Sequence, residues 1–115
     1  MLLQIMKSKI HRVRITQADV NYIGSITIDP VLIKAAKMIP GEKVQVLNVS
    51  NGERLETYVI EGDQEGEIGI NGPAALKMQK GDIVIIVSYA FIEYDLATKH
   101  KPMIIFPNEQ TNRLE

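Results

Sequence analysis

Alternating apolar and polar positions run through much of the chain and predict β-strands. In residues 43–49, Val44, Val46 and Asn48 share one face, and the following Asn51-Gly52 pair is a strong signal for a hairpin turn into residues 54–60. Residues 82–89 are dense in Ile and Val, which is typical of a strand buried on both faces. Shorter segments of similar character predict strands at residues 10–16, 25–28, 67–70 and 102–106.

The strand predicted at residues 10–16 has a regular alternation. Ile10, Arg12 and Arg14 fall on one face, whereas Val13 and Ile15 fall on the other with His11.

Two short helices are predicted between the strands. Asp29 suits the N-cap of the first helix and Pro30 its first turn. Apolar residues then recur at helical spacing, and Pro40-Gly41 is expected to end the helix after the stripe formed by Leu32, Ala35, Ala36 and Ile39. A shorter second helix is predicted from Pro73 to Met78.

These elements predict a mainly β fold in a single domain spanning residues 1–115. Many short strands with two or so short helices in a chain of 115 residues favour a small closed barrel. The passages 25–49 and 67–89 are loosely alike, which suggests a pseudo-symmetric barrel. Residues 108–115 form a polar tail that is predicted to be mobile.

Composition narrows the possible functions. Lys and Arg number 13 and Asp and Glu number 14, so neither a nucleic-acid nor a membrane partner is predicted. The absence of cysteine excludes disulfides, thiolate catalysis and a zinc–cysteine site, and the two histidines, His11 and His100, lie too far apart for a metal motif. The apolar run at the N-terminus is too short for a signal peptide and no segment could span a bilayer, so a cytoplasmic protein is predicted.

The Gly24-Ser25 pair offers a specific chemical possibility, self-cleavage of the chain. Gly24 has no β-carbon, so its peptide can adopt strained geometry and its carbonyl is open to attack by the next hydroxyl. The resulting ester can eliminate to dehydroalanine, which hydrolyses to a pyruvoyl group. The alternative is an ordinary turn leading into a strand.

A set of motifs around this pair resembles the bacterial aspartate 1-decarboxylase family. The resemblance runs in order and at family spacing over about residues 5 to 90. It is carried by residues 9–13, Ala18-Asp19, residues 22–29, residues 48–54, Thr57-Tyr58, Asn71-Gly72, Ala74-Ala75 and residues 81–86.

The resemblance implies a fold, an assembly and a reaction. The fold would be a six-stranded double-psi β-barrel, assembled as a homotetramer with active sites between subunits. The chain would be a proenzyme that cleaves itself between Gly24 and Ser25, and a maturation helper is a possible partner. The mature enzyme would convert L-aspartate to β-alanine and CO2 through a Schiff base on the pyruvoyl group formed from Ser25, for pantothenate and coenzyme A synthesis. Neither a metal nor pyridoxal phosphate is expected.

The resemblance also implies roles for individual residues. Tyr58 would be the proton donor, where the alternative is a packing aromatic. Substrate binding would involve Thr57, Arg54 and Lys9 together with the loop residues Gly72, Pro73 and Ala74. Supporting residues would be His11, Tyr22, Asn71 and Ala75. The sequence departs from the commonest family form at Pro73, which has no N–H and so cannot donate a backbone hydrogen bond to substrate.

Three other functions remain open at this stage. The segment from Gly24 to Val46 also resembles swapped-hairpin DNA-binding regulators, although a net charge of -1 and the segments after residue 50 argue against this. A catalytically silent barrel would keep Ser25 as an ordinary serine. Decarboxylation of glutamate in place of aspartate is a further alternative.

Overall fold

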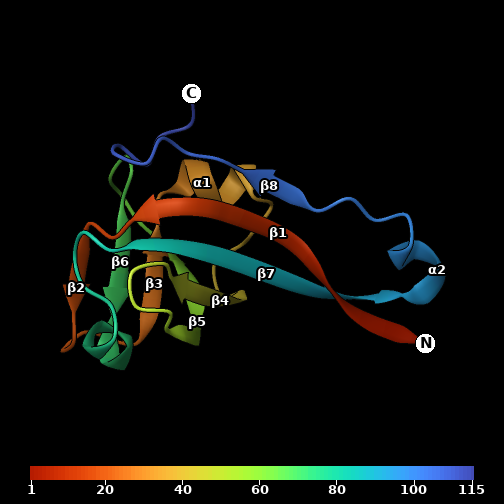
Figure 1. The fold of residues 1–115 in the computed structure, drawn as a ribbon, viewed down its shortest axis with the longest axis horizontal. Helices are drawn as coiled ribbons and strands as arrows, with labels where there is room; N and C mark the ends of the chain where they lie inside the picture. Colours follow the sequence, from red (N-terminus) through yellow and green to blue (C-terminus); the bar gives the residue numbers. More distant parts are fainter.

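The computed structural model describes all 115 residues and is built mainly from β-strands (Figure 1). Eight strands form one mixed sheet in the order β2-β6-β3-β5-β4-β7-β1-β8. Their bounds are β1 Leu2–Arg14, β2 Gln17–Asp19, β3 Ser25–Ile28, β4 Lys43–Asn48, β5 Arg54–Glu61, β6 Ile68–Asn71, β7 Ile83–Glu93 and β8 Met103–Ile105. Two α-helices, α1 Pro30–Ala35 and α2 Tyr94–Ala97, and the 3-10 helix η1 Gly72–Leu76 connect them. The mainly β class is confirmed.

The number of strands differs from the predicted six. β2 is separated from β1 at Ile15 and Thr16 and pairs in parallel with β6, while β8 adds in parallel to the edge of β1. Between β1 and β2 the Thr16 amide donates to the Ile68 carbonyl at 2.8 Å. The continuous segment β1–β2 therefore contacts β7 at one end and β6 at the other, and the sheet curls around a core of Ile and Val side chains.

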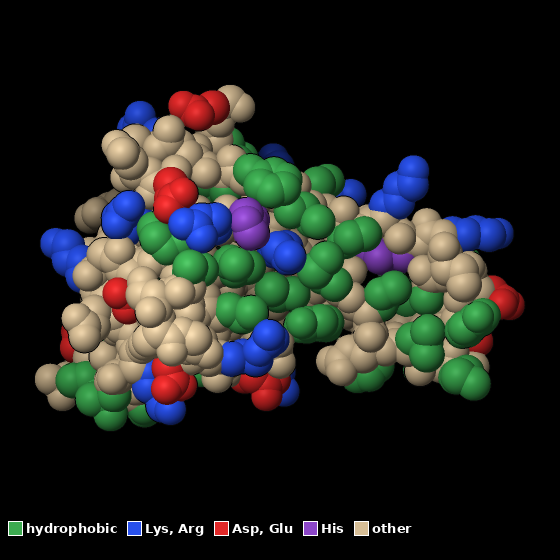
Figure 2. Space-filling view, viewed as in Figure 1, with side chains coloured by type: hydrophobic (Ala, Val, Ile, Leu, Met, Phe, Trp, Pro, Cys, Tyr) green, Lys and Arg blue, Asp and Glu red, His purple; other side chains and the backbone are tan.

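β1 and β7 extend beyond this core as a two-stranded arm. Their antiparallel register runs from Leu2 opposite Glu93 to Arg14 opposite Ile83, and α2 and the N-terminus lie at the far end of the arm (Figure 1). Both strands are longer than predicted, because pairing between them supplies backbone hydrogen bonds where neither sequence alternates. Figure 2 shows hydrophobic side chains along the arm, and the exposed ones near its end are Met1, Leu2, Phe91, Tyr94 and Leu96.

A β-bulge in β1 overturns the predicted alternation of residues 10–16. The register with β7 shifts between Ile10 and Val13, and Arg12 adopts a left-handed backbone with φ of 68°. The extra residue changes the phase of the strand. Ile10, Val13 and Ile15 are consequently all buried in the core.

Helix α1 begins as predicted and ends early. The Asp29 side chain caps it by accepting a hydrogen bond from the Val31 amide at 2.9 Å. Lys37 then adopts φ of 57°, so the chain leaves the helix before Pro40-Gly41 and Ile39 is exposed. The second predicted helix forms as the 3-10 helix η1. None of the helices has the length and apolar character that crossing a membrane requires.

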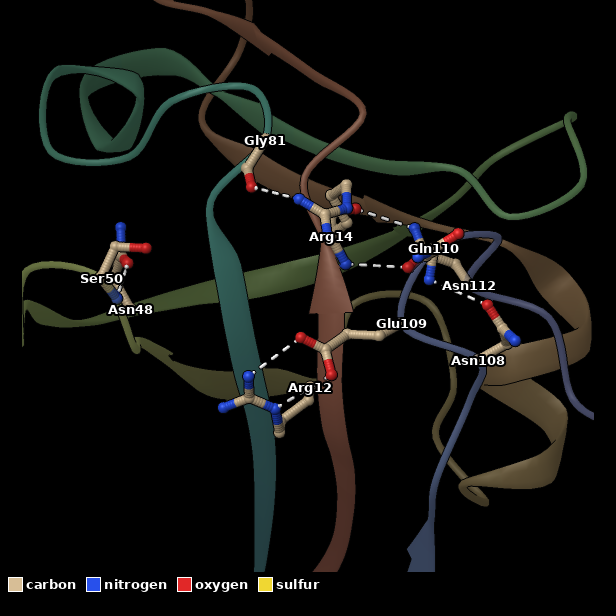
Figure 3. Close-up of polar contacts among 9 residues, drawn as sticks. All are labelled: Arg12, Arg14, Asn48, Ser50, Gly81, Asn108, Glu109, Gln110 and Asn112. Carbon is tan, nitrogen blue, oxygen red and sulfur yellow. Dashed lines mark hydrogen bonds and ion pairs between the residues drawn. The ribbon is translucent and has the colours of Figure 1, made fainter.

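The polar tail, which the sequence predicts to be mobile, is hydrogen-bonded to the sheet in the structure. Asn112 is buried, and its side-chain amide donates to the Arg14 carbonyl and accepts from the Arg14 amide, both at 2.8 Å (Figure 3). The same amide nitrogen donates to the Gly66 carbonyl at 2.8 Å. The Arg12 guanidinium binds Glu109 at 2.9 Å and lowers the pKa of that carboxyl group. Three hydrogen bonds of one buried amide therefore tie the tail to β1 and to the loop before β6.

Candidate active site

The Gly24-Ser25 peptide lies where an exposed loop enters the buried strand β3. Tyr22 and Ile23 are exposed, Gly24 is half-buried, and Ser25 is only 1% exposed. The Ser25 hydroxyl donates to the Ile23 carbonyl at 3.2 Å. A nucleophile is thus held at the boundary between solvent and core, directly after a glycine.

Asn71 holds the Ser25 hydroxyl from the neighbouring strand. Antiparallel pairing of β3 with β6 places Asn71 opposite Ser25. The buried Asn71 amide nitrogen donates to the hydroxyls of Ser25 at 3.0 Å and Thr27 at 2.9 Å. Because its two donors are used in this way, the amide fixes Ser25 as an acceptor and directs the serine proton toward Ile23.

Gly72 allows the loop after β6 to approach Gly24 closely. Gly72 has φ of 75°, and a β-carbon there would lie 2.6 Å from the Gly24 α-carbon. This position therefore needs glycine both for its backbone conformation and for space. The approach brings the start of η1, including Pro73 and Ala74, against the Gly24-Ser25 peptide.

A pocket of about 460 Å³ opens beside this peptide. Predicted site residues from β5, β6 and η1 line this pocket together with Gly24. Its lining consists of Gly24, Leu55, Glu56, Thr57, Tyr58, Asn71, Pro73, Ala74 and Lys77. Thr57 and Tyr58 have opposite orientations along β5, yet both reach the pocket within a single chain.

Several predicted site residues lie outside this pocket. The Arg54 guanidinium donates to Gln45 at 2.8 Å and lines a separate hollow with Asn48 and Gly52. Lys9 lies in β1, paired with Val87 of β7 on one side and Ile104 of β8 on the other. The His11 ring packs edge-on against the Phe106 ring, with the two ring centroids 5.5 Å apart.

The last two predicted residues, Tyr22 and Ala75, also do not line the pocket. Tyr22 lines an acidic hollow with Asp19, Glu61, Asp63 and Glu67, and Ala75 packs against the hydrophobic core.

No group of three or more His, Asp or Glu side chains is placed to hold a metal ion. A further hollow of about 480 Å³, over β4 and β7, contains none of the predicted residues, so chemistry rather than volume identifies the site.

The structure adds three polar residues that the sequence did not single out, namely Thr27, Lys77 and Glu56, of which Glu56 lines the pocket from β5. Thr27 shares the Asn71 amide with Ser25, and its position two residues after Ser25 in a strand was the available signal. Lys77 lines the pocket from the end of η1, four residues after Pro73. Its spacing in the helix predicted from Pro73 to Met78 could have placed Lys77 beside the loop. That spacing could not have shown that Lys77 lines the pocket.

Comparison with known proteins identifies the family of the chain. The model of the family described as aspartate decarboxylase matches residues 1–114. The chain is 56% identical to an aspartate 1-decarboxylase of Flavobacterium psychrophilum and 56% identical to one of Christiangramia forsetii, each over 100% of both chains. It is 53% identical to an aspartate 1-decarboxylase of Cytophaga hutchinsonii over 99% of both chains. The predicted resemblance is confirmed, and the chain belongs to the aspartate decarboxylase family of enzymes.

Proposed function

We propose that this protein is a pyruvoyl-dependent aspartate 1-decarboxylase that matures by cleaving its own chain between Gly24 and Ser25. The reaction would convert L-aspartate to β-alanine and CO2. The observation that carries the proposal is the buried Ser25 hydroxyl, held by Asn71 directly after Gly24 and beside a pocket that contains Thr57 and Tyr58.

Self-cleavage uses atoms that the chain already holds together. The Ser25 oxygen attacks the Gly24 carbonyl carbon, the peptide C–N bond breaks, and the nitrogen takes up the hydroxyl proton. Loss of the Ser25 α-proton then expels the Gly24 carboxylate and leaves dehydroalanine. One water replaces its nitrogen, which departs as ammonia, and the new N-terminus becomes a pyruvoyl group.

The surroundings of Ser25 fit this sequence of steps. The Asn71 amide fixes the orientation of the hydroxyl, and the Gly24-Ser25 peptide lies at the edge of the pocket where water can enter. Gly24 leaves the carbonyl face free of a side chain. The nearest atom to a β-carbon built at Gly24 would be in the Pro73 ring, at 3.8 Å.

The pyruvoyl group would supply the ketone that binds the substrate amine. It would also accept the electron pair that remains on the substrate carbon when CO2 departs. The residues of the pocket would then bind, orient and protonate. We assign the Tyr58 hydroxyl to protonation of the substrate carbon that has lost CO2 and Thr57 to substrate contact. Gly72 and Ala74 would position the substrate through the loop, where Pro73 offers no N–H.

We propose that the predicted residues missing from the pocket act across a subunit boundary. Arg54 and Lys9 would then come from a neighbouring chain, as in a homotetramer with active sites between subunits. The exposed apolar end of the β1–β7 arm supports an assembly, because such a surface is usually covered by a partner. Light scattering on the purified protein measures the number of subunits.

The finer features of the fold and biology belong to the same proposal. We propose that the curled sheet is a double-psi barrel in which β1 and β2 together form one of six barrel strands. A role in pantothenate synthesis, a cytoplasmic location and the use of a maturation helper remain predictions from the sequence.

Intact mass spectrometry of the purified protein under denaturing conditions tests the proposal. We expect two chains, residues 1–24 and a larger chain that begins with pyruvoyl in place of Ser25. Ser25→Ala should remain one chain and should not release CO2 from aspartate. A wild-type chain that stays intact after prolonged warming and after addition of cell extract would contradict the mechanism.

A further inference from the structure

Lys77 is the one lysine or arginine among the residues that line the proposed substrate pocket. The pocket contains a single negative side chain, Glu56, which is paired with Lys43 at 3.0 Å. Arg54 lies in another hollow, where it binds Gln45. A substrate with two carboxylates therefore meets only one cation from the chain that forms this pocket.

The backbone of Lys77 is fixed from both sides. Its amide donates to the Ala74 carbonyl at 3.0 Å, and its carbonyl accepts from the Asn51 side chain at 2.8 Å. The hairpin turn between β4 and β5 thus holds the end of η1. The Lys77 side chain consequently starts from a defined point beside the pocket.

The ammonium group itself is only weakly engaged. Its one ion pair, with Glu53, is long at 3.3 Å, and the two side chains are 57% and 42% exposed. Exposed pairs of this kind contribute only about 0–1 kcal/mol to stability. Lys77 can therefore exchange Glu53 for a carboxylate in the pocket at small cost.

We propose that Lys77 binds the side-chain carboxylate of the substrate and so contributes to its recognition. The inference rests on the proposed decarboxylase function and adds a residue to it. The Lys77 contact also compensates for the backbone hydrogen bond to substrate that Pro73, in the same loop, cannot donate.

The choice between the two substrate carboxylates follows from the reaction. The α-carboxylate loses its charge as CO2 departs, so a cation bound to it would stabilise the ground state more than the transition state. The side-chain carboxylate keeps its charge in substrate, transition state and product. A cation bound there lowers the free energy of all three states equally. Its loss therefore raises KM and leaves kcat nearly unchanged.

The test compares Lys77→Met with wild type and with Lys80→Met, a control that removes an exposed lysine from the following turn. Intact mass should show normal cleavage in all three proteins. For Lys77→Met we expect KM for aspartate to rise roughly tenfold, the loss expected for one charge-assisted contact partly open to water. Its kcat should stay within about twofold of wild type, and Lys77→Arg should restore most of the affinity.

Binding of succinate by calorimetry gives a second readout that does not depend on turnover. Succinate carries two carboxylates and no amine, so it cannot condense with a ketone. Its Kd should rise roughly tenfold in Lys77→Met for the same electrostatic reason. Glu53→Gln frees Lys77 from its pair and should leave KM unchanged or lower it.

The outcomes separate this inference from the proposed function. If wild type is cleaved and decarboxylates aspartate while Lys77→Met keeps the wild-type KM and succinate Kd, the role of Lys77 is wrong and the function stands. If Glu53→Gln reproduces the Lys77→Met defect, the lysine acts only through that ion pair and the inference is also overturned. A wild type that neither cleaves nor consumes aspartate removes the proposed function itself.

Discussion

Gly24 and Gly72 approach so closely that a β-carbon at Gly72 would lie 2.6 Å from the Gly24 α-carbon and 2.9 Å from its nitrogen. One glycine belongs to the peptide proposed to break, and the other begins the loop that forms the pocket. The contact couples the geometry of the cleavage peptide to the position of η1.

Gly72→Ala should therefore slow cleavage strongly. The new methyl group must displace backbone at Gly24, and alanine at φ of 75° adds about 1–2 kcal/mol of strain. Gly41→Ala is the matched control, because Gly41 has φ of 90° but no atom within 4 Å of the added carbon. Mass spectra over time after purification measure both rates, and equal rates would show that the close approach of Gly72 to Gly24 does not control cleavage.

Thr27→Val should slow cleavage by impairing the orientation of Asn71. Valine has nearly the same shape but leaves one Asn71 donor without its acceptor at 2.9 Å. An unpaired buried donor costs about 1–3 kcal/mol, which corresponds to roughly tenfold or more in rate if cleavage needs the amide in place. Thr27→Ser should cleave nearly as fast as wild type. Normal cleavage by the valine variant would mean that the Asn71 amide needs no second acceptor.

Tyr58→Phe should separate maturation from turnover. We expect normal cleavage together with a loss of about 10²-fold or more in kcat, because the proton donor is absent. Tyr89→Phe removes a hydroxyl that contacts Gln45 outside the pocket, and it should retain wild-type activity. Measurement of CO2 release from aspartate decides the matter, and unchanged turnover in Tyr58→Phe would assign that residue to packing.

Asn112→Ala should destabilise the fold although only three residues follow it in the chain. It removes three hydrogen bonds from a buried amide and leaves groups of Arg14 and Gly66 to find water, for a loss of about 2 kcal/mol or more. Gln110→Ala, an exposed change in the same tail, should have little effect. Urea denaturation gives both values, and two equal midpoints would indicate that the tail adds nothing to stability.

Glu42→Gln should lower the melting temperature in a pH-dependent way. Burial disfavours ionisation of Glu42, but hydrogen bonds from Lys7, Ser88 and the Ile39 amide outweigh it, so the pKa of this carboxyl lies below its ordinary value. The ionised group thus stabilises the fold above the unfolded pKa of about 4.3, and this contribution disappears as pH falls through the lowered folded pKa.

The difference between wild type and Glu42→Gln should accordingly be largest at neutral pH and shrink in acid. Glu61→Gln, at an exposed position of β5, provides the control for the loss of one carboxylate. Thermal unfolding followed by circular dichroism at several pH values measures it. A difference that is constant with pH would argue that the charge of Glu42 is not what stabilises the fold.

Local sequence signals predicted the elements whose formation depends on near neighbours. Asp29 and Pro30 begin α1 because capping and the first helical turn need only adjacent residues. Val44, Val46 and Asn48 are buried on one face of β4 as their alternation indicated. Gly52, at φ of 76°, occupies the predicted turn between β4 and β5.

Most of the pocket could also be predicted, but only through the ordered set of family motifs. Gly24, Thr57, Tyr58, Asn71, Pro73 and Ala74 do line one pocket, with Ser25 hydrogen-bonded to Asn71. Lys9, His11 and Arg54 do not join them within the single chain. A list of motifs carries no information on which strand edges meet.

By itself, then, the sequence determined the mainly β class and the start of α1, which follow from residue type and short-range spacing. It also determined the family and most of the residues that line the pocket, through an ordered set of motifs. Only the tertiary structure decided the phase change at Arg12, the length of the β1–β7 arm, the early end of α1 and the anchoring of Asn112. It also decided that Lys77 faces the pocket. These features depend on pairing and packing between segments far apart in the chain, and no local pattern records which partner a hydrogen bond or side chain will find.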